Sequence, residues 1–127
     1  GSEMCIRDRV TITPKFNNSK VLVTVTLNGV YTQEAAHYVR FHLYKASSNL
    51  TGITTAHGQA LASSSNETEY ATGLSTVYLD SPATTSATTY KVQMGADGTA
   101  ATLYVNRYYH TNNYTGISTL TLYEVST

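Results

Sequence analysis

Hydrophobic and polar residues alternate one by one along several short segments of the chain. The clearest case is residues 20–31, where four apolar side chains occupy every second position: Val21, Val23, Val25 and Leu27. Because successive side chains of a strand point to opposite faces, this period of two predicts a half-buried β-strand. Leu22, Thr24 and Thr26 are expected on its other face.

Six more segments are predicted to be strands, and turn residues bound most of them. They are residues 10–14, 38–44, 75–79, 89–94, 103–107 and 117–125. We expect their alternate apolar side chains to face a common core: Val39, Phe41, Leu43, Val77, Leu79, Tyr90, Val92 and Met94. The residues between them, such as His42 and Lys91, are expected on the outer faces.

Turn residues separate these segments. Residues 17–19 are expected to form a turn, and Asp80, followed by Ser81 and Pro82, is expected to end a strand as a turn former. Residues 95–98 end in Asp-Gly, which tolerates positive φ, so they predict a hairpin with residues 103–107 as its return strand. One or two further strands are expected within residues 46–76, near residues 59–62.

The pattern as a whole predicts an all-β fold. No window has a convincing period of 3.6 residues, and short strands recur every 10 to 20 residues or so with turn signals between them. Without crossover helices the strands are expected to pair antiparallel. The prediction is an antiparallel β-sandwich, jelly-roll-like, of about eight strands, and 127 residues fit one such domain.

The first nine residues differ from the rest. Gly1-Ser2 resembles a protease-cleavage scar, and residues 3–9 resemble a translated sequencing-adapter fragment. We therefore assign residues 1–9 to a foreign arm and residues 10–127 to a single β-sandwich domain; a native polar arm is the alternative. Cys5, the one cysteine, lies in this arm and leaves no internal disulfide framework.

Charge and hydropathy narrow the classes of partner. Eight basic and eight acidic residues cancel, and only 13% of residues are charged. A nucleic-acid-binding domain would be expected to show a basic excess, so no nucleic acid partner is predicted. The sequence also has no run of about 18 apolar residues, so no membrane insertion is predicted.

Catalytic motifs are missing from the sequence, which predicts that the protein is not an enzyme. There is no Gly-x-Ser-x-Gly elbow, and a glycosidase would need two suitably spaced carboxylates. Six acidic residues lie outside the arm: Glu34, Glu67, Glu69, Asp80, Asp97 and Glu124. Of these, Asp80 and Asp97 are interpreted as turn formers, and Glu67 and Glu69 as solvated loop residues.

Metal-ligand spacing is missing as well, so neither a metal nor another cofactor is predicted. The four histidines are scattered: His37, His42, His57 and His110. The alternative is a three-histidine site around a threefold axis, for which His42 is the best placed; a solvent-facing or interface histidine is the preferred interpretation.

The densest candidate for recognition is a tyrosine-rich segment. The chain has eleven tyrosines and no tryptophan. The candidate receptor- or glycan-binding residues are Arg107, Tyr108, Tyr109, His110, Asn112, Asn113 and Tyr114. Aromatic faces and amide groups suit sugar recognition, because tyrosine offers a rigid face and a hydroxyl at low entropic cost. The alternative is that Tyr108 and Tyr109 straddle a strand end, one in the core and one at a subunit interface.

Several blocks of sequence carry a family resemblance. The blocks are residues 12–14, 19–23, 78–93, 104–107 and 118–125, and the specific part is Asp-Ser-Pro-Ala-Thr-Thr at 80–85 with Tyr-Lys-Val-Gln at 90–93. Together they resemble a C-terminal domain common in marine phage virion proteins such as tail fibres. The resemblance covers most of residues 10–127, but residues 35–76 match only loosely.

The resemblance implies a function and a location. It implies a virion protein of the tail fibre, a homotrimer, and a host cell-surface glycan or protein as partner. The succession of predicted strands along the chain is also similar to that of the trimeric jelly rolls of tumour necrosis factor and complement C1q, by fold-level analogy alone. The alternatives are a purely structural trimerisation or capsid-decoration module, and a carbohydrate-binding module of a secreted adhesin.

Overall fold

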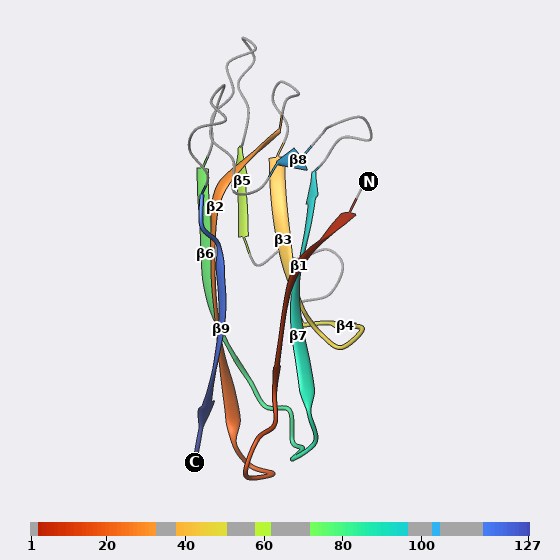
Figure 1. The fold of residues 1–127 in the computed structure, drawn as a ribbon, viewed down its shortest axis with the longest axis vertical. Helices are drawn as coiled ribbons and strands as arrows, with labels where there is room; N and C mark the ends of the chain where they lie inside the picture. Colours follow the sequence, from red (N-terminus) through yellow and green to blue (C-terminus); the bar gives the residue numbers. More distant parts are fainter. Residues whose placement is uncertain (1–2, 33–37, 51–57, 62–71, 97–102, 105–115) are drawn as a thin grey trace.

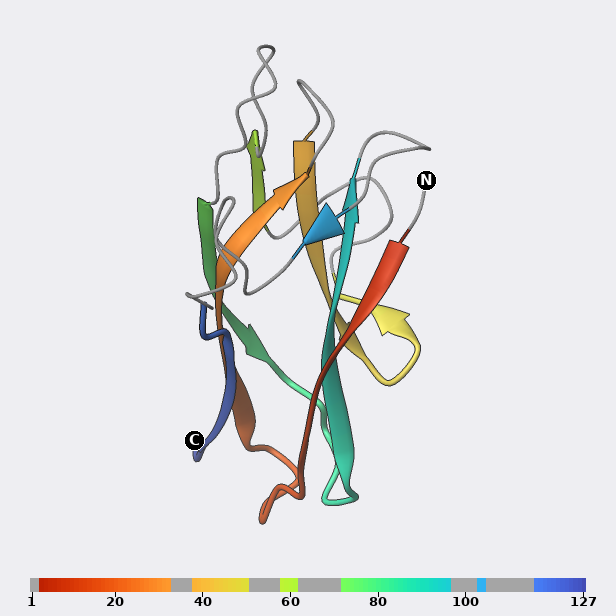
Figure 2. The same ribbon diagram turned by 45° about the horizontal axis from the view of Figure 1, so that its top comes forward.

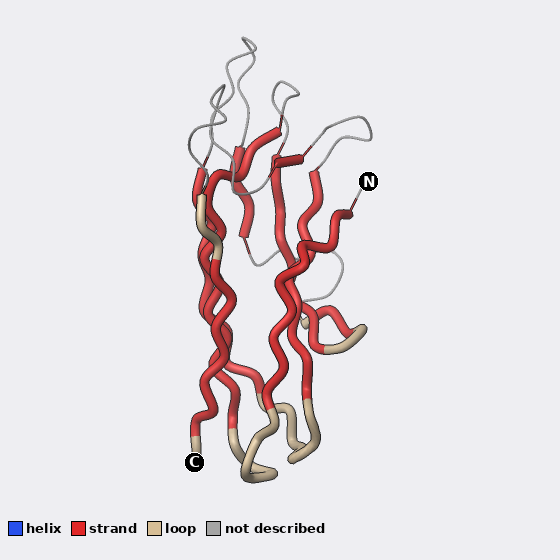
Figure 3. Tube along the Cα trace, viewed as in Figure 1, coloured by secondary structure: helices blue, strands red, loops and turns tan. Residues whose placement is uncertain are grey.

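The computed structural model describes residues 3–32, 38–50, 58–61, 72–96, 103–104 and 116–127. These residues form nine strands and no helix (Figures 1 and 3). The strands form two antiparallel sheets packed face to face, which confirms the predicted all-β sandwich. Figure 2 shows the two layers still separate after rotation.

The larger sheet has the order β1-β7-β3-β4, with β5 also paired to β3. Its strands are β1 (Glu3–Ile12), β3 (Tyr38–Lys45), β4 (Ser48–Asn49), β5 (Gly58–Leu61) and β7 (Thr88–Ala96). The smaller sheet has the order β6-β2-β8, with β9 also paired to β2. Its strands are β2 (Lys20–Thr32), β6 (Thr72–Asp80), β8 (Leu103–Tyr104) and β9 (Thr119–Val125).

Consecutive strands repeatedly belong to different sheets. Among the described strands, the chain changes sheet between β1 and β2, between β2 and β3, between β5 and β6, between β6 and β7, and between β7 and β8. A meander would keep consecutive strands side by side in one sheet, so these crossings exclude a meander and agree with a sandwich that has Greek-key connections. At one end of the molecule, the lower end in Figure 1, lie the connections at 13–19 and 81–87 and the C-terminus.

The core fills the space between the inner faces of the two sheets. Its buried apolar residues are Val21, Val23, Val25, Leu27, Val30, Phe41, Leu43, Leu74, Tyr90, Val92 and Met94. The predicted inward positions of β2 and β7 are therefore confirmed, as are Phe41 and Leu43 of β3. The side chain of Val39 lies outside the described residues.

The prediction for β6 was wrong. Val77 and Leu79 were expected inside, but their side chains are 65% and 50% exposed. Tyr78 packs against the core instead, and Leu74 and Asp80, which share its face, are buried. Three consecutive apolar residues, Val77-Tyr78-Leu79, make both faces of this strand apolar, so alternation could not decide which face points inward.

This orientation of β6 leads to a test with two matched substitutions. Val23→Thr places a hydroxyl in the core and is expected to lower the free energy of unfolding by about 2 kcal/mol. Val77→Thr exposes its hydroxyl to water and is expected to change it by less than about 0.5 kcal/mol. Urea denaturation at low protein concentration measures both; equal costs at the two sites would contradict the orientation of β6.

The predicted hairpin between β7 and residues 103–107 was also wrong. β8 pairs with β2, through Tyr31 with Tyr104 and Thr32 with Leu103. The reason is that both edges of β7 are occupied, one by β1 and the other by β3. Residues 97–102 and 105–107 lie outside the described residues.

A bulge in β2 precedes the pairing with β8. The register of β2 with β6 shifts between Leu27 and Val30, and Gly29 there has a φ of 62°. Glycine adopts this left-handed conformation without steric cost, so it suits a bulge. Beside Gly29, the side-chain amide of Asn28 donates to the backbone carbonyl of Ile117 at 2.7 Å and holds the segment that leads into β9.

The first strand is longer than predicted. β1 pairs with β7 without interruption from Arg9 to Ile12, and the register shifts between Cys5 and Arg9. The turn predicted at 17–19 is confirmed, since the Ser19 amide donates to the Phe16 carbonyl at 3.1 Å.

Candidate functional site

The tyrosine-rich candidate site, residues 107–114, lies outside the described residues, so it stays a prediction. His42 lies on β3 opposite Gln93 of β7 and is only partly buried. Within the described part of the chain, no group of three or more His, Cys, Asp or Glu residues is placed to hold a metal ion. No helix there is long and apolar enough to cross a membrane.

The outer face of the smaller sheet is the candidate surface that the structure does describe. The register across its three long strands forms three rows: Leu79-Leu22-Tyr123, then Val77-Thr24-Thr121, then Ser75-Thr26-Thr119. Lys20 and Val125 lie opposite each other beyond the first row. We call these eleven residues the outer face of β6-β2-β9.

This surface leaves large apolar side chains in water. Val77, Leu79, Tyr123 and Val125 are 65%, 50%, 54% and 39% exposed, and Leu22 lies between Leu79 and Tyr123 on the central strand. Scattered exposed apolar residues are ordinary, but contiguous apolar patches mark interaction surfaces. The apolar side chains here lie on three neighbouring strands, so they form a contiguous patch of the kind that marks an interaction surface.

Charge is almost missing from the same surface. Lys20 is the one charged residue among the eleven, at the end of the face. A partner would therefore remove little charge from water, and burying an unpaired charge is the largest cost of covering a surface. The five positions that are neither apolar nor charged are serine and threonine, whose hydroxyls can exchange water for a partner's polar groups.

The outer face of the larger sheet has a different character. Its two central strands present Arg40, His42, Tyr44, Lys91 and Gln93. The Lys91 ammonium lies 5.3 Å from the centre of the Tyr44 ring, a cation–π contact. The described parts of the two outer faces therefore differ. The central strands of the larger sheet carry two cations among polar side chains, whereas the outer face of β6-β2-β9 is apolar and nearly uncharged.

The apolar surface was not predicted, although the sequence carries a signal for it. The alternation in β2 places Leu22 on the outer face, and Tyr123 lies opposite Leu22 on β9. An apolar residue at an outward position of one strand is ordinary. The same occurrence on three strands becomes informative only when the strand order shows that they are neighbours, and the sequence does not reveal that order.

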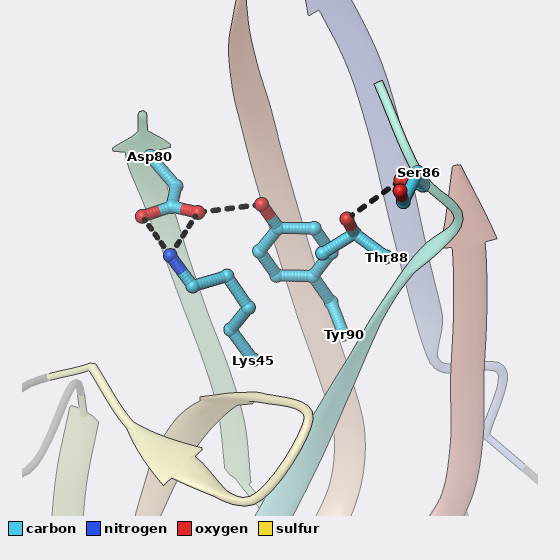
Figure 4. A network of polar contacts seen from close by, with 5 residues as sticks. All are labelled: Lys45, Asp80, Ser86, Thr88 and Tyr90. Atoms are coloured by element: carbon cyan, nitrogen blue, oxygen red, sulfur yellow. Dashed lines mark hydrogen bonds and ion pairs between the residues drawn. The ribbon is translucent and has the colours of Figure 1, made fainter. Parts of the chain in front are cut away.

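A polar cluster, buried at Asp80 and Tyr90 and partly exposed at Lys45, joins the two sheets on the inner side of β6 (Figure 4). The Tyr90 hydroxyl of β7 donates to the Asp80 carboxylate of β6 at 2.5 Å. The Lys45 ammonium, at the end of β3, lies 3.2 Å from the same carboxylate. Asp80 was predicted to be a turn former; it does end β6, but its carboxylate points into the sandwich and links three strands.

Burial raises the pKa of one member of this cluster, Tyr90. Burial of the Tyr90 hydroxyl, its hydrogen bond to Asp80 and the negative charge of Asp80 all raise the Tyr90 pKa well above its ordinary value. A raised pKa on folding means that the folded state holds the proton more tightly. The resulting stability is complete below the unfolded pKa, near 10, and is lost as the pH rises above it.

This titration predicts a difference in alkaline stability between the wild type and Tyr90→Phe. Between pH 10 and pH 11 the free energy of unfolding is expected to fall by about 1 kcal/mol more in the wild type than in the variant. The reason is that the unfolded wild type releases the Tyr90 proton in this range, whereas the folded wild type keeps it. Urea midpoints measured at both pH values provide the comparison. A parallel fall in the two proteins would mean that Tyr90 does not carry the effect.

Comparison with known proteins adds no family. No protein-family model matches the chain, and no curated protein matches it. The resemblance to phage virion proteins therefore stays a prediction from the sequence blocks. Two residues of its most specific block, Asp80 and Tyr90, are the bonded pair of the buried cluster, so that block includes a structural feature of the sandwich.

Proposed function

We propose that this domain is a structural part of a phage virion, the C-terminal domain of a trimeric tail fibre that engages the host surface. Its work is binding and assembly rather than catalysis. The supports are the sequence blocks that resemble virion proteins and the β-sandwich with two outer faces of different character.

The main structural support for the proposal is the exposure of apolar side chains on the outer face of β6-β2-β9. Val77, Leu79 and Tyr123 are at least half exposed, although the sheet already buries its other face in the core. Leaving apolar area in water forgoes about 25 cal/mol per Å² of stabilisation. A partner that covers this surface would recover that stabilisation, so the composition indicates a domain that functions while bound to another molecule.

Host recognition has its own experiment. A glycan array of bacterial surface polysaccharides is expected to bind the purified domain, and the variant Tyr109→Ala/Asn112→Ala/Tyr114→Ala is expected to lose that binding while it keeps its unfolding temperature. If the triple variant instead weakens assembly and leaves glycan binding intact, these residues belong to a subunit interface.

The complete gene distinguishes a fibre from the alternative functions. A repetitive fibre shaft encoded upstream is the expected result. An enzyme domain or a secretory signal in that position would support the secreted adhesin instead. A shaft upstream together with a domain that binds neither glycans nor cells would leave the purely structural trimerisation module.

A further inference from the structure

We infer that the outer face of β6-β2-β9 is the contact surface between copies of this chain, arranged around an axis parallel to the strands. This inference rests on the proposed function and specifies which surface would build the trimer. The occupant of the face is a second copy of the same chain, with its strands parallel and its corresponding ends together.

The near absence of charge favours a second copy over an unrelated partner. Different proteins commonly select each other through complementary charges, which steer the encounter and exclude wrong partners. Lys20 is the one charge on this face, so it offers little for such selection. Copies in a cyclic trimer repeat one contact at every interface, so no second, complementary surface has to be selected. Because the one charge of the face, Lys20, lies at its end, the copies bring little like charge together.

The cationic character of the opposite face supports the same choice. Arg40 and Lys91 lie on the two central strands of the larger sheet. Copies that met through that sheet would bring these positive charges together, which destabilises an interface. Of the two broad faces of the sandwich, the outer face of β6-β2-β9 is the one that can meet itself without that cost.

The direction of the copies follows from a gradient of polarity along the strands. The row Leu79-Leu22-Tyr123 is apolar, and the row Ser75-Thr26-Thr119, four residues and about 13 Å away, carries hydroxyls. Antiparallel copies would place the apolar row of one against the hydroxyl row of the other. Parallel copies match apolar with apolar, and Lys20, at the end of the face, stays at the rim where its long side chain reaches water.

Light scattering on the purified domain tests the surface. The wild type is expected at three times the chain mass of 13.8 kDa. Val77→Lys adds a charge to the face of each copy and is expected to weaken association by at least about 100-fold. The control Thr11→Lys adds the same charge at an exposed position of β1, in the other sheet, and is expected to leave the mass unchanged.

Two results would overturn the inference about the surface. One is a wild type that stays monomeric at concentrations of tens of micromolar. The other is a Val77→Lys variant that assembles as well as the wild type while it keeps a folded circular-dichroism spectrum.

Cross-linking tests the direction of the copies. In a Cys5→Ser background, Lys20→Cys and Thr26→Cys place single thiols about 20 Å apart on β2, the central strand. Parallel copies are expected to give cross-linked product with a short bismaleimide in each variant alone. Product only in the mixture of the two variants, or none at all, would overturn the parallel arrangement.

The oligomeric state and the upstream gene sequence together distinguish a failure of the proposed interface from a failure of the proposed function. A monomeric domain whose gene encodes a fibre shaft upstream overturns the self-assembly inference and keeps the fibre function. A parallel trimer whose gene encodes an upstream enzyme domain overturns the fibre function and keeps the interface.

Discussion

Asp80→Ala is expected to lower the free energy of unfolding by about 3 kcal/mol, because it removes the acceptor of a buried hydroxyl and one partner of a partly buried charge pair. The carboxylate accepts from the Tyr90 hydroxyl at 2.5 Å and lies 3.2 Å from the Lys45 ammonium. Without it, a buried hydroxyl loses its acceptor and the Lys45 charge loses its counter-ion. Chemical denaturation measures the loss.

A double-mutant cycle isolates the Asp80–Tyr90 contact. Tyr90→Phe alone is expected to lower the free energy of unfolding by about 1.5 kcal/mol. In the Asp80→Ala background the same substitution is expected to lower it much less, because the hydrogen bond from the Tyr90 hydroxyl is already missing there. Asp80→Asn keeps an acceptor for the hydroxyl and is expected to cost less than Asp80→Ala. Equal costs of Tyr90→Phe in both backgrounds would show that the two side chains are not coupled.

Phe41→Ala is expected to have the largest effect, a loss of about 4 kcal/mol of unfolding free energy. Phe41 has no exposed surface and lies in the core between the two sheets. Its truncation leaves a cavity that rigid strands cannot close, so lost burial and lost packing add together. This amount is a large fraction of the 5–15 kcal/mol typical of a whole domain.

The conservative variant Phe41→Leu provides the control for that prediction. It keeps most of the apolar volume and is expected to cost roughly 1.5 kcal/mol. The denaturant midpoint is expected to fall in both variants while the slope of the transition stays constant. A loss below about 1 kcal/mol for Phe41→Ala would contradict the central position of this side chain.

The sequence predicted those parts of the fold in which one strand face is apolar and the other polar. In β2, valine and leucine occupy one face through residue 27, and β7 has Tyr90, Val92 and Met94 on one face, so the inward side was unambiguous. In β6 both faces are apolar around Tyr78, and the inward face is the one that carries Asp80, whose partners Tyr90 and Lys45 come from the other sheet. The alternation within β6 does not show that pairing.

Pairing and the candidate surface depended on strand order, which local patterns do not contain. Asp97-Gly98 favours a hairpin, but β1 and β3 already occupy both edges of β7, so β8 pairs with β2. Likewise Leu22, Val77 and Tyr123 become one surface only because β6, β2 and β9 are neighbours. The tyrosine-rich segment at 107–114 could be singled out from composition, and its placement stays a prediction.

The reactivity of Tyr123 toward a tyrosine-modifying reagent, followed by peptide mapping, tests most directly whether another copy covers the outer face of β6-β2-β9. In the single chain this side chain is 54% exposed, so it should react readily unless another copy covers it. Tyr44, on the outer face of the larger sheet, is the internal reference. If the outer face of β6-β2-β9 is covered by another copy, Tyr123 is expected to react more slowly in the wild type than in Val77→Lys, with the rate of Tyr44 unchanged. Equal Tyr123 rates in the two proteins would contradict the proposed contact.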